Sequence, residues 1–107
     1  MNVTFEEFKK CEMKIGTIIV AESVEGSDKL LRLEVDFGVY KRQILSGIAK
    51  WYKPEDLIGK QLPFIVNLEP RSMMGMESQG MLIATDNEEG AVLLFPEKPV
   101  PNGSNMR

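Results

Sequence analysis

Hydrophobic and polar residues alternate most clearly over residues 31–37, where Leu31, Leu33, Val35 and Phe37 are separated by charged residues. A period of two predicts a strand with one buried face. Residues 11–21 alternate less regularly and predict a long strand buried on much of both faces. Shorter apolar runs between turn residues predict four more strands, over residues 40–46, 61–68, 80–85 and 91–95.

Two of these predicted strands contain a residue that interrupts a regular sheet. Gly16 lies inside the strand at residues 11–21 and predicts a bulge or a tight bend. Pro63 lies inside the strand at residues 61–68. Because proline has no backbone N–H, we expect it at a sheet edge or at the start of a strand.

Helical signals are short. Thr4 and Glu7 have the spacing of a capping box, and Val3 and Phe8 have that of a hydrophobic staple, so a helix of about two turns is predicted there. Residues 54–59 begin with proline and acidic residues and end with glycine, which predicts one helical turn. The other segments are predicted to be loops or extended chain: residues 22–28, 70–79, 86–90 and the tail from residue 96.

This order of elements predicts the fold. Five or six short strands, with one helical turn between the third and the fourth, are typical of a small closed barrel. We expect an all-β protein: a five-stranded OB-fold barrel with a short helix and with N- and C-terminal extensions, forming a single domain over residues 1–107. The periodicity alone leaves an SH3-like barrel as an alternative. An OB-fold binds oligonucleotides or sugars on its second and third strands and on its first-second and fourth-fifth loops.

Composition narrows the class of protein. Hydrophobic residues make up 43% of the chain and charged residues 27%, which is usual for a globular domain. No apolar run is long enough to span a membrane, no signal peptide opens the chain, and Cys11 is the single cysteine. A cytoplasmic protein is therefore expected. The net charge of −3 means that a nucleic-acid binder would have to gather its basic residues on one face, or select by shape and stacking.

The chain has no histidine, which removes the most common general base and metal ligand. With one cysteine as well, zinc sites and Ser-His or Cys-His nucleophile pairs are excluded. No close pair of carboxylates indicates acid-base chemistry. We therefore expect no catalytic site, metal or cofactor.

Five motifs identify a family resemblance. They are Asp28-Lys29-Leu30-Leu31, residues 42–49 (RQILSGIA), residues 54–60 (PEDLIGK), Asn67-Leu68, and residues 77–81 (ESQGM). Their order and spacing resemble the tRNA-binding domain found at the C-terminus of methionyl-tRNA synthetase and as stand-alone tRNA-binding proteins. The resemblance implies an OB-fold homodimer that grips the outer corner of tRNA by shape. It further implies a non-catalytic β subunit of the synthetase, with the catalytic subunit as a possible partner, because the synthetase's catalytic signatures are absent.

The resemblance also implies where tRNA is bound. Lys29 ends the first-second loop and would neutralise a phosphate, and Arg42 on the third strand would reach a phosphate or a base. Ser78 would offer its hydroxyl to the RNA backbone, and Met81 an apolar surface to a base or ribose. The chain departs from the family at Gly26, where asparagine is usual, and this removes one expected polar contact.

Three of the four site residues also have a structural explanation. Arg42 could form an ion pair with Glu34 or Asp36, Ser78 could satisfy backbone groups in its loop, and Lys29 could be a solvated surface residue. Trp51 and Tyr52 are better explained as closing the bottom of the barrel than as stacking on bases. Two other functions remain open: a dimeric chaperone of the same fold that binds extended peptides, and a subunit that only assembles with other proteins.

Overall fold

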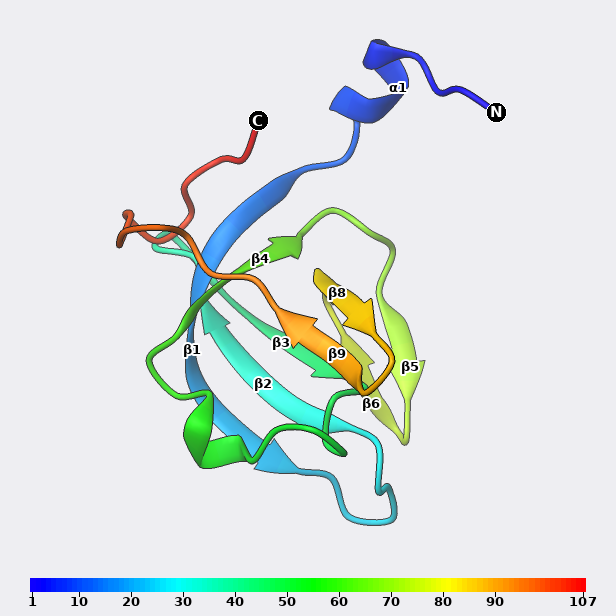
Figure 1. The fold of residues 1–107 in the computed structure, drawn as a ribbon, viewed down its shortest axis with the longest axis vertical. Coiled ribbons are helices and arrows are strands. Elements are labelled where there is room, and N and C mark those ends of the chain that lie inside the picture. The colour runs from blue at the N-terminus through cyan, green and yellow to red at the C-terminus, as the bar shows by residue number, and fades with distance from the viewer.

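A computed structural model describes residues 1–107 and shows a small β barrel with extensions at both ends (Figure 1). Its elements are α1 (Phe5–Lys9), β1 (Met13–Ser23), β2 (Leu31–Asp36), β3 (Lys41–Ser46), the 3-10 helix η1 (Pro54–Asp56), β4 (Gln61–Ile65), β5 (Arg71–Met73), β6 (Met76–Ser78), β7 (Met81–Leu82), β8 (Ala84–Asn87) and β9 (Gly90–Leu93). No helix is long and apolar enough to cross a membrane.

The barrel is one antiparallel sheet with the strand order β3-β2-β1-β4-β7. β2 alternates strictly, with Leu31, Leu33 and Val35 buried and the residues between them half-buried. Burying each such side chain stabilises the fold by roughly 1.5–3 kcal/mol. Leu82 of β7 and Leu93 of β9 join the same core cluster, so the strand segments after the loops are part of the barrel. The predicted all-β, five-stranded barrel is confirmed.

Gly16 has a different role from the predicted bulge. The register of β1 against β2 shifts between Ile18 and Val20, not at Gly16. A Cβ atom at Gly16 would lie 2.5 Å from Cγ1 of Val35 and 2.8 Å from Cε1 of Phe37. Glycine is needed there because core side chains press directly against the backbone of β1.

The prediction for Pro63 is wrong, because Pro63 is the third residue of β4, which has β1 on one side and β7 on the other. Its partner in β1 is Ile15, whose N–H and C=O bind Ser104 and Gly103 of the C-terminal segment. On the other side the Pro63 carbonyl accepts a hydrogen bond from Ile83, where β7 has ended. No ladder bond therefore requires an N–H at this position.

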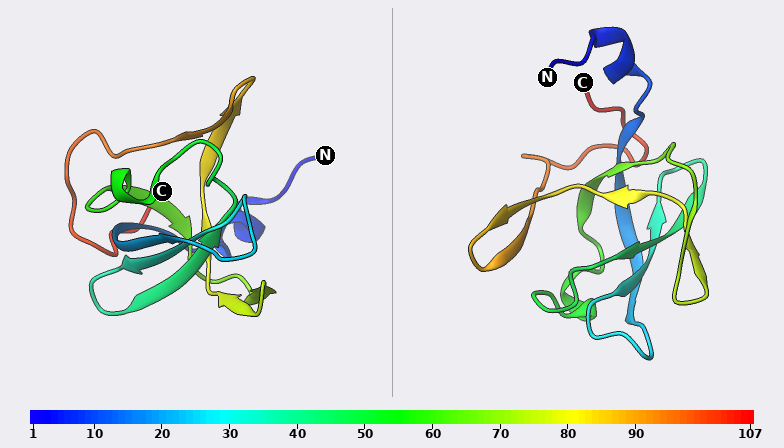
Figure 2. Two further views of the ribbon diagram at one scale, coloured as in Figure 1. Left: turned by 90° about the horizontal axis from the view of Figure 1, so that it is seen from below. Right: turned by 90° about the vertical axis from the view of Figure 1, so that its right-hand side faces the viewer.

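Residues 70–79 form a hairpin instead of the predicted loop. β5 and β6 pair across a two-residue turn at Met74 and Gly75, which have φ values of 51° and 76°. Positive φ at both positions is the geometry of the tight hairpin turn usually made by Asn-Gly. The strand predicted over residues 80–85 is interrupted at Ile83, which separates β7 from the hairpin of β8 and β9. The tip of that second hairpin projects from the barrel (Figure 2).

The two ends of the chain behave differently. The capping box of α1 is confirmed, since Glu7 N–H donates to Thr4 Oγ1 at 3.1 Å and Thr4 N–H donates to Glu7 Oε1 at 3.2 Å. α1 stands off the barrel with Phe5 and Phe8 exposed (Figure 1). The C-terminal segment instead returns to β1, where Asn105 bridges Lys14.

Candidate nucleic-acid interface

The barrel closes along a seam where β3 meets residues 78–79. Gln79 N–H donates to the Gln43 carbonyl at 2.8 Å, and the Gln79 side chain accepts from Gln43 N–H at 3.0 Å. Further along, Leu45 N–H donates to Ser78 Oγ at 3.0 Å. Side-chain oxygens therefore accept the N–H groups that a neighbouring strand would otherwise satisfy. The two motifs at residues 42–49 and 77–81 are the two sides of this seam.

Ser78 is built into the seam. Its side chain is 3% exposed, and its hydroxyl accepts from Leu45 N–H and donates to the Gly80 carbonyl at 3.1 Å. A buried N–H without a partner lowers the stability of the fold by about 1–3 kcal/mol, so the Ser78 hydroxyl stabilises the fold by accepting from Leu45 N–H. The predicted tRNA contact of Ser78 stays a prediction, and these bonds favour the alternative that Ser78 satisfies backbone groups.

Arg42 is half-buried at the same seam. Its Nη1 donates to the carbonyls of Val66 at 2.7 Å and Gln79 at 3.2 Å, and its guanidinium carbon lies 4.6 Å from the centre of the Tyr40 ring. The ion pair with Glu34 or Asp36 is not formed. Arg42 thus ties β3 to the β4–β5 connection, and its predicted contact with tRNA is not tested by this arrangement.

A groove of about 390 Å³ lies beside the seam. It is lined by the end of the β1–β2 loop, the end of β3, the β4–β5 connection, and β5 to β7: Leu30, Leu45, Ser46, Gly47, Leu68, Glu69, Arg71, Met73, Ser78, Gly80, Met81 and Leu82. These elements make up the face on which OB-folds bind their ligands. The groove combines an apolar floor with a cationic side chain, Arg71, and an anionic one, Glu69.

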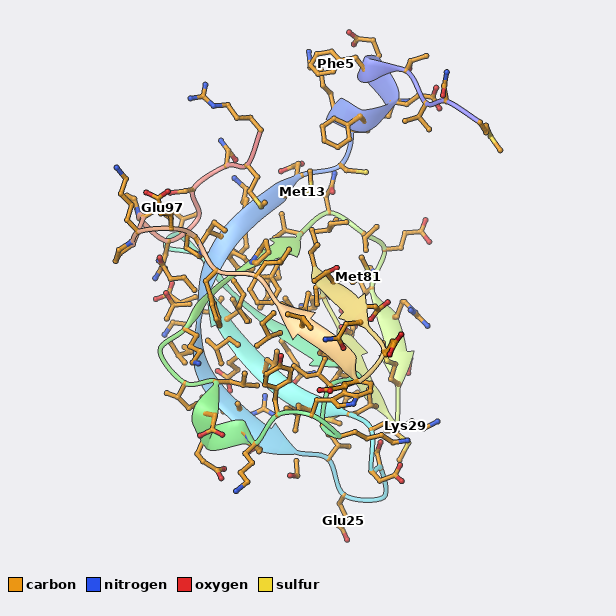
Figure 3. All side chains as sticks on the ribbon, viewed as in Figure 1. Phe5, Met13, Glu25, Lys29, Met81 and Glu97 are labelled. Atoms are coloured by element: carbon orange, nitrogen blue, oxygen red, sulfur yellow. The ribbon has the colours of Figure 1, made fainter.

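Met81 and Lys29 lie at this face with their side chains exposed (Figure 3). Met81 lines the groove and is 46% exposed, and Lys29 directly precedes the groove residue Leu30. Of the four predicted site residues, Lys29 and Met81 are therefore exposed to solvent, whereas Arg42 and Ser78 form hydrogen bonds within the seam. Arg71 and Leu68 are additional groove residues. The Asn67-Leu68 motif was the sequence signal for the second of them.

Both ion pairs of the structure belong to Arg32. Its guanidinium contacts Glu22 Oε1 at 2.6 Å and Glu34 Oε2 at 3.2 Å. The bond to Glu22 is the main cause that raises the pKa of Arg32 above its usual value, against the opposing effect of burial. Lys29 and Arg71 form no ion pair in the structure, which leaves their charges free to bind phosphate.

Gly26, where the chain departs from the family, lies against the β5–β6 hairpin. It has φ +86°, a left-handed conformation that glycine adopts freely and asparagine also tolerates, and a Cβ atom there would lie 3.2 Å from the methyl carbon at the end of the Met74 side chain. The tip of the β5–β6 hairpin therefore lies against the β1–β2 loop. This contact closes one end of the face that carries the groove.

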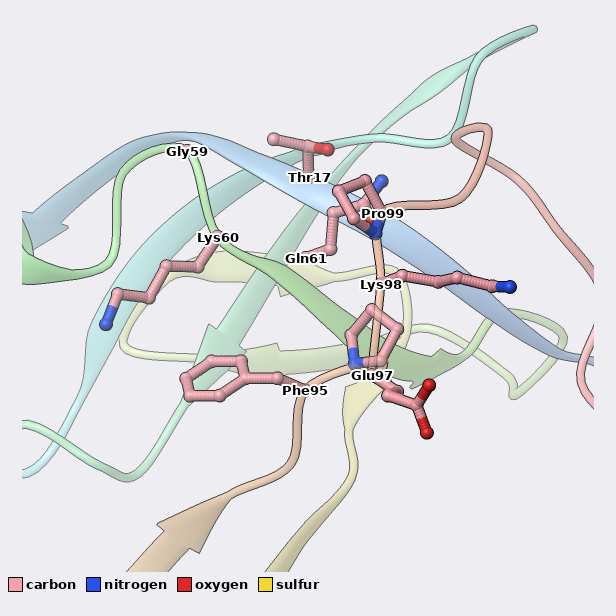
Figure 4. A pocket seen from close by; sticks show the side chains of 9 residues that line it. Thr17, Gly59, Lys60, Gln61, Phe95, Glu97, Lys98 and Pro99 are labelled. Carbon is pink, nitrogen blue, oxygen red and sulfur yellow. The ribbon is translucent and has the colours of Figure 1, made fainter.

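Another hollow, of about 520 Å³, lies between the C-terminal segment and the start of β4 (Figure 4). The side chains of Thr17 and Gln61 are already bonded within the chain, since Thr17 Oγ1 donates to Asn102 and Gln61 Nε2 donates to the Val100 carbonyl. The lysines of this hollow, Lys60 and Lys98, point in opposite directions (Figure 4). The hollow is formed where the C-terminal segment packs on β1 and β4, and its charged side chains do not point toward a common ligand position (Figure 4).

Comparisons with known proteins agree with this geometry. Residues 13–105 match the tRNA binding domain family. A methionine--tRNA ligase of Methanothrix thermoacetophila is 52% identical over 98% of this chain, and the match spans 16% of that ligase.

Two solved structures match over the whole chain. A MetRS related protein from Pyrococcus horikoshii is 41% identical with a TM-score of 0.94, and the match covers 99% of that protein. The chaperone CsaA of Bacillus anthracis is 34% identical with a TM-score of 0.90 over all of both chains. The chain belongs to the tRNA binding domain family.

Proposed function

We propose that this chain binds tRNA by shape through the groove and acts in the cytoplasm as a non-catalytic accessory of methionyl-tRNA synthetase. The observation that carries the proposal is the groove itself: an open, apolar-floored channel on the OB-fold ligand face with unpaired Lys29 and Arg71 beside it. Phosphate contacts of this kind position RNA without reading its sequence.

Two comparisons support the link to the synthetase. The ligase of Methanothrix thermoacetophila contains a segment 52% identical to this chain. The Pyrococcus horikoshii protein that matches the chain end to end is a MetRS related protein. A second weak site on the same tRNA raises the effective concentration of substrate at a catalytic site, without further chemistry.

The proposal includes a homodimer, as the family resemblance implies. α1 supports this, because it stands off the barrel and leaves the aromatic side chains of Phe5 and Phe8 exposed (Figure 1). A two-fold axis would let the same apolar surface cover itself. Sedimentation equilibrium tests this part independently of RNA binding: a monomer at micromolar concentration would contradict it.

The test of tRNA binding is a titration with unfractionated tRNA and with single-stranded DNA of equal length, each at several salt concentrations. We expect tighter binding to tRNA, with a slope of log K against log salt of about −0.7 to −0.9 for each phosphate neutralised. Equal affinity for both ligands, or no binding, would contradict shape-selective tRNA recognition.

A second candidate function is peptide binding in the same groove. It is favoured by the full-length match to the chaperone CsaA and by the apolar floor of Leu68, Met73 and Met81. Extended peptides would bind with little dependence on salt. An unfolded peptide is titrated against labelled tRNA at low and at high salt. Salt strongly weakens binding at a tRNA site and leaves binding at a peptide site nearly unchanged, and this difference separates the two functions.

A further inference from the structure

Trp51 and Tyr52 are adjacent but differ in their surroundings. Tyr52 is half-buried against the core, and its hydroxyl donates to the Ala91 carbonyl at 3.1 Å and accepts from Leu93 N–H at 3.3 Å. It therefore closes the barrel end, as expected. Trp51 is 46% exposed, so it does not close the barrel.

The indole of Trp51 is held in place. A Cβ atom at Gly90 would overlap its ring atoms Cε2, Nε1 and Cδ2, so the ring rests on the backbone of the β8–β9 hairpin at Gly90. A ring supported on one side loses little conformational freedom when a ligand stacks on its exposed surface.

A hollow of about 280 Å³ adjoins Trp51 away from this hairpin. Its lining contains no residue of β8 or β9 and no carboxylate: Ser23, Leu31, Ala49, Lys50, Trp51, Tyr52, Lys53 and Pro54. Lys50 and Lys53 are exposed and have no ion-pair partner. One aromatic surface with two free lysines is the combination that binds unpaired nucleotides, by base stacking and phosphate neutralisation.

The hollow lies close to the groove along the chain, although the two share no lining residue. Ala49 N–H donates to the Lys29 carbonyl at 3.0 Å, which joins the segment before Trp51 to the β1–β2 loop. Leu30 lines the groove, and the next residue, Leu31, lines the hollow. Lys29 therefore lies beside the segment that carries Trp51, which places the two predicted RNA contacts on adjacent segments.

We propose that Trp51, Lys50 and Lys53 form a second RNA contact that takes one unpaired base of the bound tRNA, stacked on the indole. This inference rests on the proposed function, since it extends the same tRNA interface around the end of the barrel. Stacking on an aromatic side chain is tolerant of base identity, so this contact would add affinity and preference for unpaired regions without sequence selectivity.

The protein's own fluorescence tests the proposal, because Trp51 is the only tryptophan. At saturating tRNA, established by an independent filter-binding titration, we expect the emission to be quenched and the indole to become less accessible to acrylamide. Unchanged emission and unchanged acrylamide quenching with tRNA bound would overturn the second contact and leave the proposed function standing. Absence of tRNA binding in the filter assay would overturn both.

Variants give the size of the effect. Trp51→Ala should weaken tRNA binding by about 5- to 150-fold, and Trp51→Phe by less, because phenylalanine keeps an aromatic face. Phe95→Ala is the matched control: Phe95 is also an exposed aromatic residue beside a lysine, Lys60, but it lines the hollow of the C-terminal segment. Thermal unfolding of each variant identifies any loss of fold. Equal affinity of folded Trp51→Ala and wild type would overturn the proposal.

Discussion

The barrel seam and the groove beside it both contain residues from the stretches 42–49 and 77–81, but the side chains have different surroundings. In the seam, the side chains of Arg42 and Ser78 form hydrogen bonds with backbone atoms of the chain. At the groove, Met81 and the neighbouring Lys29 make no such bonds with their side chains and stay exposed. A family motif therefore combines residues that close the barrel with residues that can meet a ligand. Side-chain hydrogen bonding and exposure separate the two groups.

We expect the largest loss of stability when Arg42 is replaced. Arg42→Ala removes two charge-assisted hydrogen bonds and the contact with Tyr40, so we expect the free energy of unfolding to fall by about 3 kcal/mol. Urea unfolding measures this, and Arg71→Ala, an exposed groove arginine, is the control, with a change below about 0.5 kcal/mol. The salt slope of tRNA binding should be the same for Arg42→Ala as for the wild type. A shallower slope with unchanged stability would show that Arg42 is a phosphate contact.

The next largest effect is expected at Ser78. Ser78→Ala leaves the buried N–H of Leu45 without an acceptor and should destabilise the fold by about 2 kcal/mol. Ser72→Ala, on the exposed face of β5, is the matched control and should change the stability little. Below its unfolding transition the Ser78 variant should bind tRNA as the wild type does. Normal stability with lost affinity would place the hydroxyl on the RNA instead.

The groove variants should show the opposite behaviour. Lys29→Ala should leave stability unchanged, make the salt slope shallower by about one unit, and weaken tRNA binding about four- to sixfold at 0.15 M salt. Lys98→Ala, another exposed lysine remote from the groove, controls for net charge. If both lysine variants lose affinity equally, the effect of Lys29 is general electrostatic attraction and not a site contact.

The smallest effect is expected at Met81. Met81→Ala reduces the apolar floor of the groove and should weaken tRNA binding about threefold at every salt concentration, with the slope unchanged. Met106→Ala, in the C-terminal segment, should have no effect. Binding titrations at three salt concentrations check both. A change in slope for Met81→Ala would contradict an apolar role.

Much of the fold follows from local patterns in the sequence. The alternation over residues 31–37 predicts β2 because one face of that strand is buried, and Thr4 with Glu7 predicts the capping box because the motif is local. Gly16 and Pro63 could not be interpreted from the sequence alone. Their roles depend on Val35 of β2 and on the C-terminal segment, which are neighbours only in the folded chain.

The candidate site was predictable in its location and less so in its roles. Lys29 and Met81 lie where the OB-fold resemblance implies. No sequence pattern shows that the Arg42 guanidinium binds the carbonyls of Val66 and Gln79, or that the Ser78 hydroxyl accepts from Leu45 N–H, because these partners are more than 20 residues away in the chain. The β5–β6 hairpin was missed for a local reason: its turn residue Met74 adopts a positive φ that methionine rarely takes.

The most direct test uses the seven methionines, labelled with ¹³C at their methyl groups and observed by NMR during a tRNA titration. Met73 and Met81 line the groove, whereas Met1 precedes α1 and Met106 lies in the C-terminal segment, where its N–H donates to the Met13 carbonyl. We predict that tRNA shifts the methyl signals of Met73 and Met81 and leaves those of Met1 and Met106 in place. Shifts confined to Met1 and Met106 would contradict binding in the groove.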